Sequence, residues 1–189
     1  MRQGTATKLV DPTSRWRVGI GILPFAIALL ITIGDRWSKL VIQHSMGAFD
    51  SIPIVPGWLR IIHTENPGAA FGMLADGNPL LRSVVLIGIS ALVLMFVAFA
   101  LWNRNSSLTG LTSRLGLSLI LGGAVGNLYD RIVHGTVTDF IEVYHGTWSF
   151  PAFNVADSAI TVGAVFLLFD LVRPKRNTEA RRDSLTTTS

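Results

Sequence analysis

The chain has 189 residues, of which 49% are hydrophobic and only 15% are charged, and its formal net charge is +4. A soluble domain carries about 25% charged residues, so a membrane protein is the leading class. Cysteine is absent, which excludes disulfides, a thiol nucleophile and a lipid attached to a cysteine of this chain.

The basic residues gather at the two ends of the chain and in one short polar turn. Segments 1–17, 103–114 and 173–182 together hold eleven of the sixteen Lys and Arg residues. Basicity can indicate a nucleic-acid partner, but basic flanks beside apolar runs are typical of the cytoplasmic side of a membrane protein. We therefore expect these three segments in the cytoplasm and no nucleic-acid partner.

Four apolar runs predict four transmembrane helices. Residues 1–15 are expected to form a cytoplasmic N-terminal segment. The charge-free run 18–34 follows, near the short end of the roughly 17 to 25 residues that span a bilayer. No A-x-A-like cleavage site is visible, so a cleaved signal peptide is the weaker interpretation. Further helices are predicted at 80–102, 111–133 and 152–172.

The segments between the helices differ in character. The loop at about 44–78 is rich in Gly and Pro around a β-branched stretch at 58–64, which predicts a small sheet outside the membrane. The loop 134–151 has mixed strand character. The fold class expected is an all-α membrane protein with a small β-cradle outside the membrane core. Its membrane domain covers 16–172, and a basic cytoplasmic tail covers 173–189.

Two acids next to apolar segments are the leading catalytic candidates. Asp139 follows Gly135 in a predicted loop, where a turn cap is the structural alternative. Asp157 is expected about one and a half turns inside a helix that begins at 152, too deep for a simple N-cap. Acids at membrane depth are costly and mark function. If the two carboxyls face each other, they share one proton and can hydrolyse a peptide bond by acid/base catalysis.

The third predicted helix carries both packing and polar signals. Gly122 and Gly126 have the spacing that allows close approach of another helix. Asn127, Asp130 and Arg131 lie on one helix face because they are spaced i, i+3 and i+4. An ion pair between Asp130 and Arg131 is the structural alternative there. Arg131 beside an acidic pair would also hold one carboxylate charged.

Two other segments carry polar residues. Asn154 shares a helix face with Asp157, and its amide can bond a substrate carbonyl or hold a backbone strand. The run from Asp35 to Lys39, taken alone, predicts a charged cluster reaching toward the membrane interface.

Other chemistries have weaker support in the sequence. The four histidines are scattered without the spacing of zinc ligands, and Ser158 has no evident base. A proton-coupled transporter that uses the same acids is the non-enzyme alternative. A structural membrane scaffold is the third option, but it leaves Asn127, Arg131, Asn154 and Asp157 unexplained.

Five segments in order along the chain resemble the bacterial lipoprotein signal peptidases (signal peptidase II). They are Asp35–Lys39, Asn66–Phe71, Gly122–Arg131, Val137–Phe140 and Phe153–Asp157. The resemblance covers nearly the whole length. It implies an aspartic endopeptidase of the bacterial cytoplasmic (inner) membrane, with four transmembrane helices and a small periplasmic β-cradle. Such an enzyme removes signal peptides from prolipoproteins just before a diacylglyceryl-modified cysteine.

The resemblance also implies roles for residues. Asp139 and Asp157 match the catalytic pair of the family, and Asp130 matches a supporting acid. Asp35 and Lys39 match its first-span motif. Five further residues match polar positions that line its site: Asn66, Gly123, Asn127, Arg131 and Asn154. We expect a monomer in the lipid bilayer with a membrane-bound prolipoprotein substrate, and neither cofactor nor metal. The apolar residues of the cradle, among them Ile54, Trp58, Leu59, Ile61 and Phe71, are expected to rest on lipid.

Overall fold

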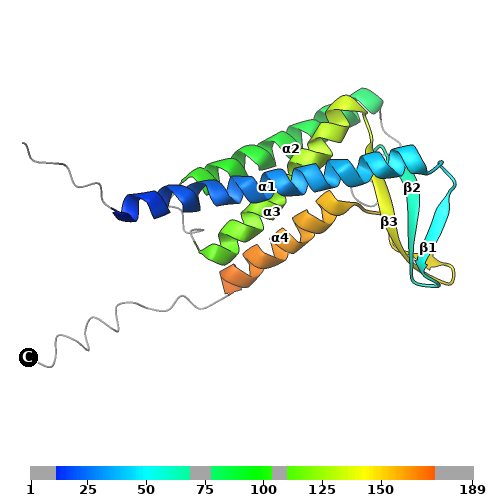
Figure 1. Cartoon of the computed structure of the whole chain (residues 1–189). Coiled ribbons are helices and arrows are strands. Elements are labelled where there is room, and N and C mark those ends of the chain that lie inside the picture. The colour runs from blue at the N-terminus through cyan, green and yellow to red at the C-terminus, as the bar shows by residue number, and fades with distance from the viewer. Residues whose placement is uncertain (1–11, 69–77, 104–109, 173–189) are drawn as a thin grey trace, which may run out of the picture.

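Four long helices lie side by side, and a small sheet is attached at one end of them (Figure 1). The protein was analysed as a computed structural model that describes residues 12–68, 78–103 and 110–172. The helices are α1 (Pro12–Ser45), α2 (Pro79–Trp102), α3 (Leu111–Val133) and α4 (Val155–Val172). The start of α1 and the end of α4 both lie at the end away from the sheet (Figure 1).

Helix α3 is the centre of the helical body because it contacts α1, α2 and α4. Its glycines permit this packing. A Cβ atom at Gly122 would lie 2.5 Å from the carbonyl oxygen of Ala28 in α1, and one at Gly123 would overlap the carbonyl oxygen of Ala156 in α4. The predicted close approach at Gly122 is therefore confirmed, and it extends to two neighbouring helices.

The sheet has four antiparallel strands in the order β1-β2-β3-β4. They are β1 (Ser51–Val55), β2 (Leu59–Asn66), β3 (Val137–His145) and β4 (Trp148–Ser149). Phe140 of β3 packs with Ile42 and Met46 of α1, which seats the sheet on the end of that helix. The sheet expected between 44 and 78 is thus present, and half of it comes from the loop that had mixed strand character.

Three local expectations were wrong. Helix α1 continues to Ser45, so Asp35 and Lys39 lie inside it with 0% of their surface exposed, rather than reaching for the membrane interface. The alternative of a turn cap for Asp139 was wrong, because Asp139 is the third residue of β3. Helix α4 begins at Val155, so Asp157 occupies its first turn. The segment expected to start this helix instead pairs with β3 through Phe153.

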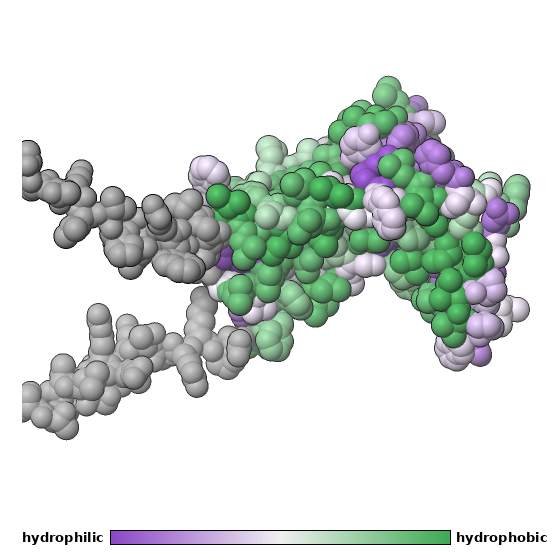
Figure 2. Space-filling view, in the orientation of Figure 1, coloured by the Kyte–Doolittle hydropathy of each residue, from purple (hydrophilic) through white to green (hydrophobic). Residues whose placement is uncertain are grey.

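Apolar side chains cover most of the helical body, and hydrophilic residues gather toward the sheet end (Figure 2). Within the described ranges, α2 and α4 are long and apolar enough to cross a membrane. Charged residues reduce the apolar character of α1 and α3, and several of them, such as Lys39 and Asp130, are buried between helices. Four membrane spans therefore stay a prediction. Phe71 of the expected cradle lies outside the described residues.

Candidate active site

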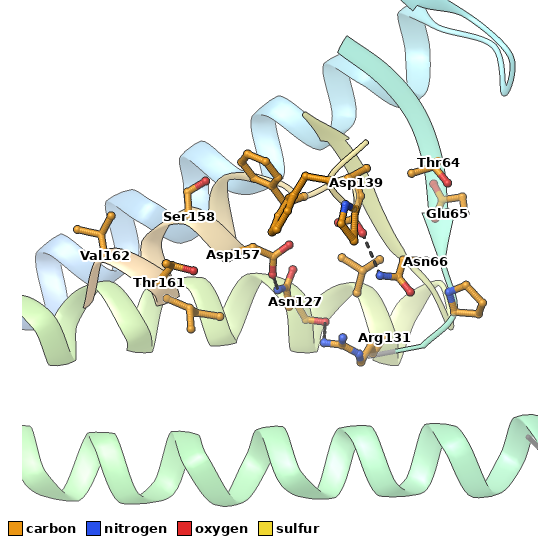
Figure 3. Close-up of a pocket in the computed structure, with 17 residues that line it drawn as sticks. Thr64, Glu65, Asn66, Asn127, Arg131, Asp139, Asp157, Ser158, Thr161 and Val162 are labelled. Atoms are coloured by element: carbon orange, nitrogen blue, oxygen red, sulfur yellow. Dashed lines mark hydrogen bonds between the residues drawn. The ribbon is translucent and has the colours of Figure 1, made fainter. Parts of the chain in front are cut away.

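Asp139 and Asp157 line one pocket of about 740 Å³, formed by β2, β3, α3 and α4 (Figure 3). Asn66, Asn127 and Arg131 line it as well. The volume is within the range of small-ligand and substrate clefts. The two acids singled out in the sequence are therefore brought to one site from two different layers of the fold.

A short backbone bridge joins those layers. The carbonyl oxygen of Phe153 accepts hydrogen bonds from the backbone N–H groups of Ile141 (2.8 Å) and Phe140 (3.1 Å). The N–H of Phe153 donates to the carbonyl oxygen of Ile141 at 3.0 Å. Because Phe153 lies two residues before α4, this bridge fixes the start of that helix beside the middle of β3. Asp139 and Asp157 are positioned by it.

Asn154 contacts both acids. Its side-chain oxygen accepts the backbone N–H of Asp157 at 2.9 Å, and a side-chain oxygen of Asp157 accepts the backbone N–H of Asn154 at 3.3 Å. This reciprocal pair is the capping arrangement that begins many helices. The amide nitrogen of Asn154 donates to Oδ1 of Asp139 at 2.7 Å. The cap of α4 thus also ties its own helix to the acid of β3.

Two further amides complete the contacts of the acids. Asn66 of β2 donates from Nδ2 to Oδ2 of Asp139 at 3.0 Å, and Asn127 of α3 donates from Nδ2 to Oδ1 of Asp157 at 2.8 Å (Figure 3). Both carboxyl oxygens of Asp139 therefore accept an amide N–H. Such bonds hold a carboxyl group in one orientation, as acid/base chemistry requires.

A buried ion cluster lies directly behind these amides. Nζ of Lys39 is 2.7 Å from Oδ2 of Asp35 and 2.7 Å from Oδ2 of Asp130. Arg36 bonds the other oxygen of Asp130 at 2.7 Å. Asp130 therefore pairs with two bases of α1 and not with its neighbour Arg131. The cluster contains two acids and two bases, which is the balance that buried charges require.

The cluster also determines how the amide of Asn127 is oriented. Lys39 Nζ donates to Oδ1 of Asn127 at 3.0 Å, and an ammonium group can only donate. The amide nitrogen of Asn127 must therefore face Asp157. Asp35 reaches α4 as well, because its Oδ1 accepts the backbone N–H of Ala156 at 2.8 Å. An acid at that position satisfies a free N–H of the first helical turn and suits the helix dipole.

Burial raises the pKa of Asp139 from 3.8 to about 6. The hydrogen bond from Asn66 opposes this rise, the nearby charge of Asp157 adds to it, and Asn154 and Lys39 oppose it. The cause is that burial disfavours the charged form of a carboxyl group. Only 3% of Asp139 is exposed. An acid of this pKa can exchange a proton near neutral pH, which is the property required of a general acid or base.

Of the two remaining predicted site residues, one lines the pocket and the other packs between helices. Arg131 lines the pocket and directs its guanidinium toward the carbonyl oxygens of Asn127 and Gly68, both at 3.4 Å. Gly123 instead packs against Ala156 of α4 and is not among the lining residues.

Sequence reasoning missed two features of the site. One is Glu65, which lines the pocket, and the other is the backbone of Phe153. The residue types in segment 64–66, which are all polar, were the available signal for Glu65.

Comparison with known proteins identifies the family of this chain. The family described as "Signal peptidase (SPase) II" matches residues 27–173. A lipoprotein signal peptidase of Solibacter usitatus is 41% identical over 165 residues, which cover 87% of this chain and 96% of that protein. A lipoprotein signal peptidase of Pseudomonas fluorescens is 39% identical and is covered over 91% of its length, with 83% of this chain.

Two solved structures have a similar fold. One, described as a bacterial membrane enzyme, superposes with a TM-score of 0.72 at 30% identity, covering 86% of this chain and 93% of its own. A second bacterial membrane enzyme has a TM-score of 0.68 at 29% identity. The chain thus shares the fold of bacterial membrane enzymes. The chain belongs to the signal peptidase II family.

Proposed function

We propose that this protein is an aspartic endopeptidase that removes signal peptides from diacylglyceryl-modified prolipoproteins, cleaving before the lipidated cysteine. Family membership supports the cleavage of prolipoprotein signal peptides. The aspartic mechanism rests on one observation. Asp139 and Asp157 line the same pocket, and Asn154 is hydrogen-bonded to both of them.

The mechanism follows from two acids that share one proton. The charged carboxylate takes a proton from a water molecule, and the water oxygen attacks the carbonyl carbon of the scissile bond. The protonated carboxyl gives its proton to the carbonyl oxygen, which yields a tetrahedral diol. The carboxyl that took the water proton then gives it to the leaving nitrogen, while the other carboxylate takes a proton from a diol hydroxyl, and the C–N bond breaks. The amides of Asn66, Asn127 and Asn154 hold the carboxyls in place throughout.

The arrangement in the membrane is part of the proposal. Both chain ends and segment 103–114 carry the excess of basic residues, so they lie in the cytoplasm and the pocket lies near the periplasmic face. In this orientation the four helices span the bacterial inner membrane. The sheet then meets the lipid headgroups, where Ile54 and Trp58, each more than half exposed, rest on lipid. The enzyme acts as a monomer and its partners are the bilayer and the prolipoprotein.

A proton-coupled transporter is the alternative function. It would place titratable groups along a path through the bilayer. Asp139, Asp157 and the ion cluster of Lys39 instead lie together toward the sheet end of the helices. This distribution favours a reaction at one membrane face.

Purified variants in lipid or detergent test the proposal directly. We expect Asp139→Asn and Asp157→Asn each to lower kcat for a diacylglyceryl-modified precursor by at least about 100-fold, the lower end of general acid–base effects. Both variants should keep the thermal unfolding transition of the parent protein, measured in the same detergent. Full turnover by either variant would eliminate the shared-proton mechanism, whereas loss of the unfolding transition would show only misfolding.

A further inference from the structure

Glu65 is a pocket-lining acid that the proposed reaction does not use. Thr138 donates to its Oε1 at 2.9 Å and Thr136 donates to its Oε2 at 2.6 Å. Nε2 of His63 lies 3.2 Å from Oε1. These contacts fix the carboxylate, yet 40% of the side chain stays exposed. Glu65 therefore presents an oriented and accessible charge to whatever enters the pocket.

The carboxylate of Glu65 is charged at neutral pH. Partial burial by itself raises its pKa, but the hydrogen bonds from Thr136, Thr138 and His63 outweigh burial, so the pKa lies below its usual value. The positive charge of the pocket, Arg131, interacts electrostatically with Asp139 and Asp157. Glu65 is thus a negative site at the edge of the pocket that β2 forms.

The two ends of the pocket differ in polarity. Val162 and Thr161 of α4 mark one end, Thr64 and Glu65 of β2 mark the other, and the two candidate catalytic acids lie between them (Figure 3). A signal helix and acyl chains need an apolar environment, and the α4 end, on an apolar helix, supplies one. The polypeptide that follows the cysteine leaves the membrane for water. It must therefore pass the polar end at β2.

We propose that Glu65 is a specificity-determining residue that meets the first two residues after the lipidated cysteine and favours basic over acidic side chains there. This inference rests on the proposed peptidase function. A partly exposed charge attracts an opposite charge and repels a like one, with an effect that is modest and screened by salt. The preference is therefore a matter of degree and not an absolute requirement.

Three precursors test the preference. They are diacylglyceryl-modified and identical except that both positions after the cysteine carry Lys, Gln or Glu. For the unaltered full-length protein in lipid at low salt, we expect kcat/KM to decrease in the order Lys, Gln, Glu, by roughly threefold at each step. Adding salt to about 0.5 M should shrink both steps, because the Debye length becomes only a few ångströms.

The variant Glu65→Gln removes the charge and keeps the shape and an oxygen acceptor. It should cleave the three precursors at rates within about 1.5-fold of one another, as expected when the charge is lost. Glu142→Gln is the matched control, because Glu142 lies on neighbouring β3, pairs with Arg60 and does not line the pocket. It should keep the parental order.

The possible outcomes separate cleanly. Equal cleavage of the three precursors by the parent protein, or an unchanged order in Glu65→Gln, would overturn the role of Glu65. No cleavage of any precursor by the parent protein would instead refute the proposed peptidase function. Should Glu65→Gln fail to fold, Glu65→Ser tested at high and low salt replaces it, and a retained salt-sensitive preference would again overturn the role.

Discussion

Individual side chains in this site act through the hydrogen-bond direction that they impose. Lys39 has no acceptor, so it orients the amide of Asn127, and that amide then presents an N–H to Asp157. Asn154 presents its own N–H to Asp139 for a similar reason, because its oxygen is occupied by the N–H of Asp157. A buried charge directly behind the pocket therefore orients the amide that contacts Asp157.

The pH dependence of the reaction should follow Asp139. Its pKa of about 6 means that the proton is present below this pH and is lost as the pH rises through it. The singly protonated pair therefore disappears on the alkaline side. We expect kcat/KM to fall there with an apparent pKa of about 6 or above, a value that belongs to the pair as a whole.

Substituting Asn66 tests whether the pKa of Asp139 sets this pH dependence. Asn66 donates to Asp139 and favours its charged form, so Asn66→Ala should move the alkaline limb to higher pH while it lowers the maximal rate. Gln43→Ala is a suitable control, because Gln43 donates to the hydroxyl of Thr138 at 2.7 Å and not to either acid. A limb that moves to lower pH in Asn66→Ala would contradict the proposed origin of the pKa.

Lys39 should matter for stability as well as orientation. Lys39→Met leaves Asp35 buried without its base, and removing one partner of a buried ion pair costs about 3–5 kcal/mol. We expect a large decrease in the thermal unfolding midpoint in detergent. Adding Asp35→Asn should restore much of the loss, because an Asn oxygen can still accept the N–H of Ala156. A double variant as unstable as the single one would argue against charge balance.

At the level of elements, the sequence predicted helix bounds best where they depend on the residues of that helix alone. Helix α3 was predicted at residues 111–133 and occupies that range, and α2 begins one residue earlier than predicted. The charge-free run at 18–34 gave no indication that α1 continues to Ser45. That continuation depends on the burial of Asp35 and Lys39 against α3 and α4, which is a contact between distant segments.

In the candidate site, too, features within one element were predicted and contacts between elements were not. The two acids and most of the amides, chosen on residue type, helix spacing and family resemblance, line one pocket, and their roles stay predictions. The partners of Asp130 and the start of α4 were not, because each depends on a contact between elements: Arg36 with Asp130, and Phe153 with Ile141. Local spacing on one helix cannot reveal a base that is 94 residues away in the chain.

The close packing of α3 can be tested by comparing an alanine substitution in α3 with one in α2. A Cβ at Gly126 would lie 2.5 Å from Oδ2 of Asp35, which Lys39 holds in place. Gly126→Ala should therefore lower both the unfolding midpoint and the rate of cleavage. Gly88 of α2 has nothing within 4 Å of its Cβ position, so Gly88→Ala should be neutral or stabilise by up to about 1 kcal/mol. Equal effects of the two changes would contradict the packing argument.

For the whole molecule, the proposed orientation can be tested by labelling single cysteines, because the natural chain has none. Thr147 lies exposed in the turn between β3 and β4, and Gly110 is exposed at the opposite end, before α3. A membrane-impermeant maleimide should label Thr147→Cys in spheroplasts and label Gly110→Cys only after the membrane is permeabilised. The reverse pattern would invert the topology and place the pocket at the cytoplasmic face.

The bridge at Phe153 also has a consequence for the newly made protein. One acid is carried by β3 and the other by α4, which follows it in the chain, so neither half of the pair has a partner until α4 has been made. Under the proposed mechanism, a nascent peptidase cannot cut the membrane polypeptides inserted beside it. Its activity begins only when α4 has packed against the other helices and its start has paired with the sheet.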